Sequence, residues 1–263
     1  MANAAPPSEL SWTAVVLAGS RPGGDPFARA NGVELKPLIP VAGEAMVRRP
    51  VRALLAAPGV GRVVVLTQEI DAIRAALELD PRVSVERSGT TIAATIECLL
   101  ADPATAFPLL VTTADHALLT AATVAEFLRM AAGADLAIGL VERRALMARL
   151  PETKRTWIGF RGGAFSGANL FGFGSREATR AVALWREVEQ DRKKGWRMLL
   201  AFGPALLLGA GLRVRTIEQS LAAVGRRLGL NIHCIELSDP LAAVDVDKPS
   251  DLALVEAIIS GNA

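Results

Sequence analysis

The 263-residue sequence has no tyrosine, only two cysteines and little net charge, and each scarcity excludes a class of protein. Aromatic residues make up 5% of the chain, too few for a surface that stacks single-stranded bases. Two cysteines far apart in the sequence exclude a disulfide scaffold and a zinc ribbon. The 29 basic and 27 acidic residues nearly balance, so the chain lacks the broad positive field that binds nucleic acid. We therefore expect no nucleic-acid partner.

Apolar residues are abundant instead. They make up 51% of the chain, charged residues make up 21%, and the mean hydropathy is +0.33, which excludes a disordered chain and a coiled coil. No basic region precedes the first apolar run, so we expect a cytoplasmic protein without a signal peptide. The uncharged stretch 198–212 is shorter than the about 20 residues of a membrane-spanning helix. It is either a buried helix pair or a surface for peripheral contact with the inner face of a membrane, or with a lipid-like substrate.

Short apolar runs alternate with helical patterns along the first half of the chain. The runs 14–17, 63–66, 108–112 and 136–141 predict buried parallel strands, and the segments 46–57, 70–79, 91–100 and 120–132 predict helices. This alternation is typical of an α/β fold with a doubly wound, mostly parallel, Rossmann-like sheet. The pattern changes at about 142–231, which we interpret as a mainly helical insertion on the substrate side, and it returns at 232–237. We predict one domain over residues 1–263.

A glycine-rich loop follows the first predicted strand. Gly19, Gly23 and Gly24 can adopt positive φ and allow the backbone to approach a phosphate chain at the carboxyl edge of the sheet. Arg21 and Lys36 would supply cationic donors for the same oxygens. Neither a Walker loop nor a G-x-G-x-x-G fingerprint is present, so the loop alone indicates either a phosphate site or a flexible connection.

Acidic residues occur at two places where a metal ion could be held. Asp115 follows the strand predicted at 108–112. A carboxylate in this place can hold Mg²⁺ beside phosphates or can simply cap a helix. Near the C-terminus, alternation predicts Asp245 and Asp247 on one face of a strand, ahead of a helix that Pro249 opens. Carboxylates from such distant positions would clamp one Mg²⁺ on an α-phosphate.

Both ends of the chain resemble a known family. The sequence LAGSR followed by LKPLIPVAGEAMV, and the closing VDVDKPSDL, are similar to nucleotidyltransferases of the molybdenum-cofactor guanylyltransferase (MobA-like) type. Their wider superfamily includes the sugar-phosphate nucleotidylyltransferases. The resemblance covers about 13–140 and 232–263, and it implies a GT-A-type nucleotidyltransferase fold. The chain departs from the family pattern at Ser20, where glycine is usual, and lacks the proline that usually follows the equivalent of Asp115.

The resemblance also implies an activity and a set of site residues. A nucleoside triphosphate, with CTP or GTP favoured, would donate its NMP group to a phosphorylated small-molecule or lipid-like acceptor in a Mg²⁺-dependent reaction that releases pyrophosphate. The implied nucleotide-binding residues are Leu17, Ala18, Gly19, Ser20, Arg21 and Lys36, with Ser88, Gly89 and Thr90 at the base or ribose. The implied catalytic residues are Lys36, Arg21, Asp115 and Asp247, and the metal ligands are Asp115, Asp247 and, second to them, Asp245. The acceptor candidates are Asn169, Lys154 and Arg161.

Three alternatives stay open at this level. Residues 88–90 are equally well explained as a helix N-cap. A GT-A-type glycosyltransferase that uses a nucleotide sugar would need an Asp-x-Asp pair after a middle strand, and the only such pair is Asp245 and Asp247 near the C-terminus. A nucleotide-binding relative without turnover would fit the departures at Ser20 and after Asp115. No feature of the sequence specifies the oligomeric state.

Overall fold

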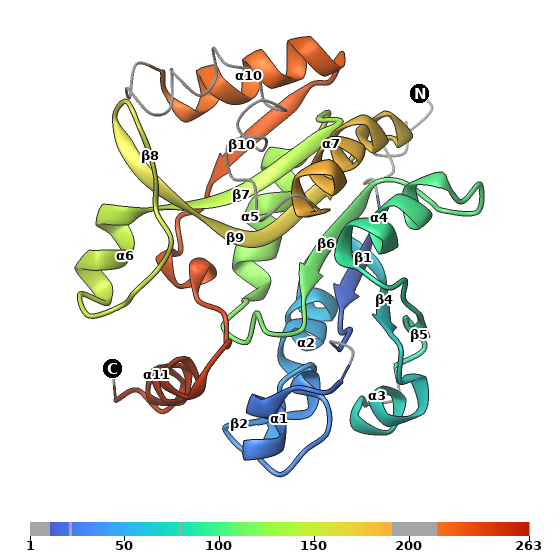
Figure 1. The fold of residues 1–263 in the computed structure, drawn as a ribbon, viewed down its shortest axis with the longest axis vertical. Helices are drawn as coiled ribbons and strands as arrows, with labels where there is room; N and C mark the ends of the chain where they lie inside the picture. Colours follow the sequence, from blue (N-terminus) through green and yellow to red (C-terminus); the bar gives the residue numbers. More distant parts are fainter. Residues whose placement is uncertain (1–10, 21–22, 79, 191–214, 263) are drawn as a thin grey trace, which may run out of the picture.

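The computed structural model of the chain describes residues 11–20, 23–78, 80–190 and 215–262. Its centre is one eight-stranded sheet (Figure 1). The strands are β1 (Trp12–Leu17), β4 (Val60–Thr67), β5 (Val83–Arg87), β6 (Leu109–Thr113), β7 (Leu136–Glu142), β8 (Ile158–Phe160), β9 (Gly163–Phe173) and β10 (Ile232–Glu236). The order is β10-β7-β9-β6-β1-β4-β5, and β8 pairs with β9 outside this path. Strand β9 runs antiparallel to its neighbours, and every other pairing in the sheet is parallel.

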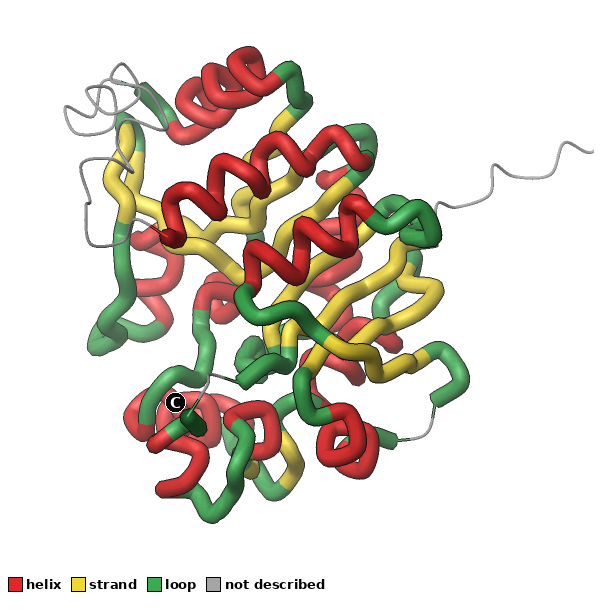
Figure 2. Tube along the Cα trace, turned by 45° about the vertical axis from the view of Figure 1, so that its right-hand side comes forward, coloured by secondary structure: helices red, strands yellow, loops and turns green. Residues whose placement is uncertain are grey.

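Helices cover both faces of this sheet (Figure 2). On one face lie α2 (Arg48–Ala56) and α5 (Ala121–Ala131), and on the other lie α4 (Ile92–Ala101) and α7 (Thr179–Gln190). Because successive side chains of a strand point to opposite faces, Val16 packs in the core that holds α2 and α5. Its neighbour Val15 packs in the second core with α4 and α7. This arrangement confirms the predicted doubly wound α/β fold.

The remaining elements are helices, 3-10 turns and one two-stranded hairpin. They are α1 (Pro26–Ala30), the 3-10 turn η1 (Lys36–Leu38), the hairpin β2 (Pro40–Val41) and β3 (Glu44–Ala45), α3 (Ile70–Ala76), α6 (Arg143–Arg149), η2 (Arg176–Ala178), α10 (Ile217–Leu228), η3 (Pro240–Ala243) and α11 (Pro249–Ile259). The last helix lies beside the first hairpin, where the Ala42 N–H donates to Glu256 Oε1 at 3.1 Å. Helix α11 and the β2–β3 hairpin therefore lie together beyond the carboxyl ends of β1 and β6 (Figure 1).

The expected insertion is partly strand. Helices α6, α7 and α10 lie within 142–231, as do β8 and the eleven-residue strand β9. Strand β9 is inserted between β6 and β7, so this part of the chain completes the central sheet as well as flanking it. The stretch 198–212 lies outside the described residues. Among the residues described, no helix is both long enough and apolar enough to cross a membrane.

The prediction of a strand at Asp245 and Asp247 is wrong. These residues lie in a loop between η3 and α11. The alternation that suggested a strand has another cause, since Val244 and Val246 are buried in the core below the loop. The Val246 N–H donates to the Asp115 carbonyl at 3.1 Å, beyond the end of β6, so the loop crosses the edge of the sheet without joining it.

Candidate active site

A polar cavity of about 560 Å³ lies at the carboxyl edge of the parallel strands. Residues that follow β1, β4, β5 and β6 form its walls, which is where open α/β sheets bind ligands. Most of the residues predicted from the sequence line it, namely Leu17, Gly19, Ser20, Lys36, Ser88, Gly89, Thr90, Asp115, Asn169 and Asp247. Ala18 is buried beside it, and Arg21 lies outside the described residues.

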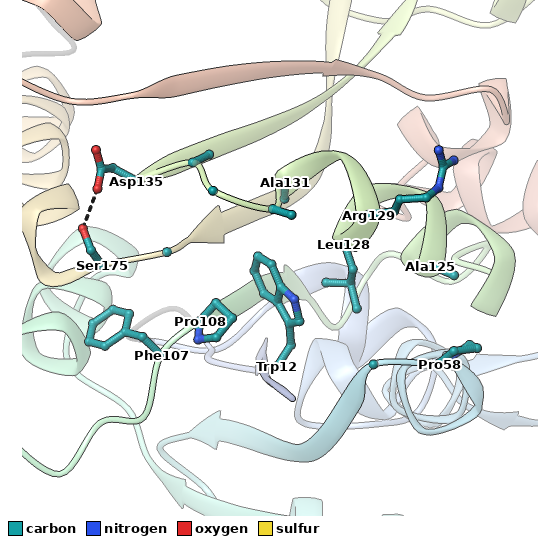
Figure 3. Close-up of a pocket in the computed structure, with 15 residues that line it drawn as sticks. Trp12, Pro58, Phe107, Pro108, Ala125, Leu128, Arg129, Ala131, Asp135 and Ser175 are labelled. Atoms are coloured by element: carbon teal, nitrogen blue, oxygen red, sulfur yellow. Dashed lines mark hydrogen bonds between the residues drawn. The ribbon is translucent and has the colours of Figure 1, made fainter. Parts of the chain in front are cut away.

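A second cavity, of about 720 Å³, opens at the opposite edge of the sheet (Figure 3). Its lining is mostly apolar and includes Trp12, Pro108 and Leu128. The carboxylate there, Asp135, already accepts a hydrogen bond from Ser175 Oγ at 2.7 Å. The cavity in which charged side chains converge is therefore the polar one, at the carboxyl edge of the parallel strands.

Lys36 connects two carboxylates in the polar cavity. Its Nζ lies 2.5 Å from Asp115 Oδ2 and 2.5 Å from Asp247 Oδ1. Lys36 is the first residue of η1, Asp115 follows β6, and Asp247 precedes α11, so three distant segments supply the cluster. The other oxygen of Asp115 accepts a hydrogen bond from Thr113 Oγ1 at 2.5 Å, which fixes the carboxylate. The side chains of Lys36 and Asp115 are each 19% exposed and that of Asp247 is 62% exposed.

The two carboxylates keep Lys36 charged. Burial by itself would lower the pKa of the ammonium. The charge of Asp115 and the hydrogen bonds to Asp115 and Asp247 outweigh that effect, so the pKa of Lys36 is raised above its ordinary value. Lys36 is therefore a fixed cation at neutral pH, in a place where an anionic ligand would find it.

The glycine loop after β1 has the backbone conformation that the sequence predicts. Gly23 and Gly24 adopt φ values of +89° and +83°, in the left-handed region that favours glycine. At Gly19, which lines the cavity, a Cβ would lie 3.2 Å from the side-chain amide of Gln68, a tight contact.

Gln68 is a site residue that the sequence reasoning missed. Its Oε1 accepts from the Ser20 N–H at 2.9 Å, and its Nε2 donates to the Gly89 carbonyl at 3.2 Å. It therefore ties the loop after β1 to the loop after β5. The signal in the sequence is a polar residue directly after the buried strand β4, the same signal that identified Asp115.

The segment 88–90 is not the cap of the helix that follows it. The N-cap of α4 is Thr91, whose side chain accepts from the Ala94 N–H at 3.1 Å. The Ser88 hydroxyl oxygen is buried and has no hydrogen-bond partner among the described residues. Since buried polar groups are usually paired, this hydroxyl on the cavity wall is a candidate ligand contact.

The predicted acceptor residues separate into two groups. Asn169 lines the cavity, whereas Lys154 and Arg161 are exposed and are not among the residues that line it. The basic residue turned inward is Arg155, whose Nη1 lies 2.6 Å from Asp245 Oδ1. Asp245, a predicted metal ligand, is thus engaged by Arg155 and does not line the cavity.

Two carboxylates remain that suit a divalent cation. Asp115 and Asp247 direct one oxygen each at a common point, now taken by the Lys36 ammonium. Mg²⁺ is bound through about one or two carboxylates with substrate phosphates and water completing its shell, so this donor set fits it. Across the described residues, no group of three or more His, Cys, Asp or Glu side chains could hold a metal ion. Oxygens of a substrate would have to complete the site.

Comparison with known proteins shows the family of the chain. Residues 14–213 match the MobA-like NTP transferase domain. A hypothetical transferase structure from Thermus thermophilus is 30% identical, covers 92% of this chain and 99% of its own, and superposes with a TM-score of 0.76. No curated protein matches the sequence.

Two further structures share the fold at lower identity. One is a 4-diphosphocytidyl-2C-methyl-D-erythritol synthase from Anaerococcus prevotii, with 9% identity, a TM-score of 0.56 and coverage of 95% of this chain and 96% of its own. The other is a CMP:2-keto-3-deoxy-manno-octonic acid synthetase complexed with CTP, with 14% identity, a TM-score of 0.56 and coverage of 96% and 100%. From the matched residues 14–213, the chain belongs to the MobA-like NTP transferase family of nucleotidyltransferases.

Proposed function

We propose that the protein is a Mg²⁺-dependent nucleotidyltransferase that moves an NMP group from CTP or GTP to a phosphorylated acceptor and releases pyrophosphate. One observation carries the proposal: a lysine ammonium lies between two carboxylates beside a glycine loop at the carboxyl edge of the sheet. We do not propose the glycosyltransferase alternative, because Asp245 is engaged by Arg155 and so does not act with Asp247 as one metal motif.

The reaction needs no nucleophile from the protein. A phosphate oxygen of the acceptor attacks the α-phosphorus of the nucleotide, the bond from that phosphorus to the bridging oxygen breaks, and pyrophosphate leaves with the electron pair. Negative charge accumulates on phosphate oxygens, and stabilising it is the main task of such a site. We assign that task to Lys36, with Gly19 and Ser20 close to the triphosphate. Arg21, which lies outside the described residues, stays a candidate for the same role.

Asp115 and Asp247 would hold the Mg²⁺, which when bound supplies positive charge to the α-phosphate. The ammonium of Lys36 and a divalent cation both require the same carboxylate oxygens. We therefore expect Lys36 to turn from the carboxylates to a phosphate oxygen in the loaded enzyme. The pair of carboxylates serves as the resting partner of the lysine when no nucleotide is bound.

The two ligands would occupy different sides of the cavity. Ser88, Gly89 and Thr90 suit the base or ribose, because the Ser88 hydroxyl has no partner within the described part of the chain. Asn169 lies on the side of β9 and suits the acceptor. CTP is the first donor to test, since two structural neighbours carry cytidyl or CTP in their names. The acceptor is a small or lipid-like phosphate.

A pyrophosphate-release assay tests this function. The four common NTPs are each combined with a panel of phosphorylated acceptors, which includes polyol phosphates and a polyprenyl phosphate in vesicles. We expect release that requires one NTP, one acceptor class and Mg²⁺, and Lys36→Ala and Asp115→Ala should lower it by about 10²–10³-fold. Asp71→Ala is the matched control for Asp115→Ala, because it removes a carboxylate that is 99% exposed and lies outside the cavity lining. Full release by the Lys36 and Asp115 variants would refute the assignment, and NTP binding without release across the panel would favour a non-catalytic relative.

A further inference from the structure

Strand β9 contains an irregularity beside the polar cavity. Against β7, Phe171 stands opposite Ile138 and Gly167 stands opposite Leu140, so three residues of β9, numbers 168–170, face the single residue Gly139. A Cβ on Gly139 would lie 3.1 Å from Leu170 Cβ, so a glycine is what allows the extra length to fit. The pairing of β9 with β6 extends to Phe171 and stops there. Such bulges redirect a side chain out of the regular ladder and are frequent next to active sites.

The residue at the centre of the bulge is Asn169, with a φ of +49°. Asparagine tolerates this left-handed conformation better than most residues with a side chain, but it is still unusual within a strand. Its Nδ2 donates to Asp245 Oδ2 at 3.2 Å. A carboxylate can only accept, so the NH₂ group and not the carbonyl oxygen must face Asp245. This argument fixes the orientation of the amide from chemistry.

Asp245 is itself held in place by an ion pair with Arg155. Its other oxygen, Oδ1, lies 2.6 Å from Arg155 Nη1, and the two side chains are only 20% and 14% exposed. Neither Asp245 nor Arg155 lines the cavity, whereas Asn169 does. One N–H of the Asn169 NH₂ group is donated to Asp245, and the carbonyl oxygen Oδ1 is left to accept from a ligand, since no described residue donates to that oxygen.

We infer that Arg155 and Asp245 are positioning residues that hold the Asn169 amide in one orientation, in which its carbonyl oxygen accepts a hydrogen bond from a hydroxyl of the acceptor substrate. This rests on the proposed function for the identity of the ligand, while the orientation itself does not. The charges divide the cavity accordingly. Lys36 attracts phosphate oxygens at one wall, and Asn169 Oδ1 selects a hydroxyl-bearing molecule at another.

An NMR experiment tests the orientation without any substrate. The chain has five asparagines, so ¹⁵N-asparagine labelling of the full-length protein gives five side-chain NH₂ pairs, and Asn169→Asp identifies one of them. In the wild type we expect the Asn169 protons downfield and protected from solvent exchange. In Asp245→Ala, which removes the acceptor, their exchange should be about 10–100-fold faster, as expected for loss of a hydrogen bond to a charged group. Asp71→Ala, which removes a 99% exposed carboxylate, is the control and should change nothing.

Asp245→Ala leaves Arg155 without its partner and could unfold the protein. The double variant Arg155→Met/Asp245→Ala removes both charges together and avoids an unpaired buried cation. The same loss of Asn169 protection is expected in the double variant. Asn169 signals that stay unchanged in either folded variant would overturn the positioning role.

Kinetics with the acceptor found in the pyrophosphate assay test the hydroxyl contact. Asn169→Ala and Asp245→Ala should raise the acceptor KM by about 3–10-fold and leave the NTP KM unchanged. With the wild type, an acceptor analogue that lacks the contacted hydroxyl should have a KM higher by the same factor. With Asn169→Ala, removing that hydroxyl should raise the KM no further. Equal discrimination by both proteins, or an NTP KM that rises in parallel, would overturn the contact. If no acceptor turns over, the proposed function has failed, and the NMR result still decides the orientation.

Discussion

Removing the ammonium of Lys36 should destabilise the protein by an amount that the contacts allow us to work out. Lys36 and Asp115 are each about one-fifth exposed, and a hydrogen bond between charged groups in such a place contributes about 1.5–3 kcal/mol. Asp247 is 62% exposed, so its ion pair with Lys36 contributes less than about 1 kcal/mol. Lys36→Met keeps most of the aliphatic side chain and loses the charge. We expect it to lower the free energy of unfolding by about 2 kcal/mol and Tm by about 4–8 °C.

The pH dependence of this difference has a definite sign. The pKa of Lys36 is raised in the folded protein above the ordinary value of 10.5, so the unfolded chain releases its proton first as the pH rises. The stabilisation is therefore fully present below pH 10.5, and it is lost as the pH rises through the folded-state pKa. The gap between wild type and Lys36→Met should be constant around neutral pH and should close in the alkaline range.

Urea unfolding and differential scanning calorimetry measure this effect directly. Lys154→Met is the matched control, because it makes the same chemical change at an exposed lysine outside the cavity lining. Mg²⁺ at constant ionic strength should raise the Tm of Lys36→Met more than that of the wild type, since the two carboxylates then lack their cation. A Lys36→Met protein within about 0.5 kcal/mol of Lys154→Met would refute the reasoning, because surface substitutions have effects of that size.

Three further outcomes follow from other contacts. Gly139→Ala should cost about 1–3 kcal/mol by calorimetry, because its Cβ would crowd the β9 bulge, whereas Gly167→Ala, which meets only open space, should cost far less. Gln68→Ala should weaken NTP binding about 5–30-fold by calorimetric titration, because two hydrogen bonds between the cavity loops are lost, and an unchanged Kd would contradict this. Burial lowers the pKa of His116 from 6.5 to about 4. The neutral imidazole therefore contributes up to about 3 kcal/mol to the free energy of unfolding above pH 6.5, and this stabilisation is lost as the pH falls through the folded-state pKa. The free energy of unfolding of His116→Gln should not fall in this way at acid pH. A pH dependence parallel to that of the wild type would contradict this.

The sequence was sufficient for the sheet and for the edge at which the site lies. Runs such as 63–66 are apolar on both faces, which is the pattern of a strand covered by helices on both sides, and β4 is such a strand. Asp115 was found because a carboxylate at the end of a buried strand has few structural reasons to be there. Lys36 and Asp247 required the family resemblance, since nothing local in the sequence joins residues so far apart.

The features that the sequence did not predict are those that depend on tertiary packing. The alternation at 244–247 has the periodicity of a strand, yet it arises because Val244 and Val246 pack on the core from a loop. Asp245 has the residue type of a metal ligand, and its pairing with Arg155 is visible only when the loop before β8 and the loop before α11 are placed together. Strand β9 lies in the segment interpreted as an insertion, because the alternation of strand and helix patterns changes at about residue 142. Its place as an antiparallel strand between β6 and β7 depends on long-range pairing.

The measurement that tests the central claim most directly is a thermal-shift panel of ATP, CTP, GTP and UTP, each with and without Mg²⁺, on the wild type and on Asp115→Ala. A nucleotide at about 100 times its Kd stabilises the fold by about 2.7 kcal/mol, which corresponds to a shift of about 5–10 °C. We predict that one nucleotide, CTP or GTP, gives such a shift in the wild type only with Mg²⁺, and that Asp115→Ala loses it. The absence of a shift with every NTP, or a shift that Asp115→Ala retains in full, would contradict the assignment of this cavity as the nucleotidyl-transfer site.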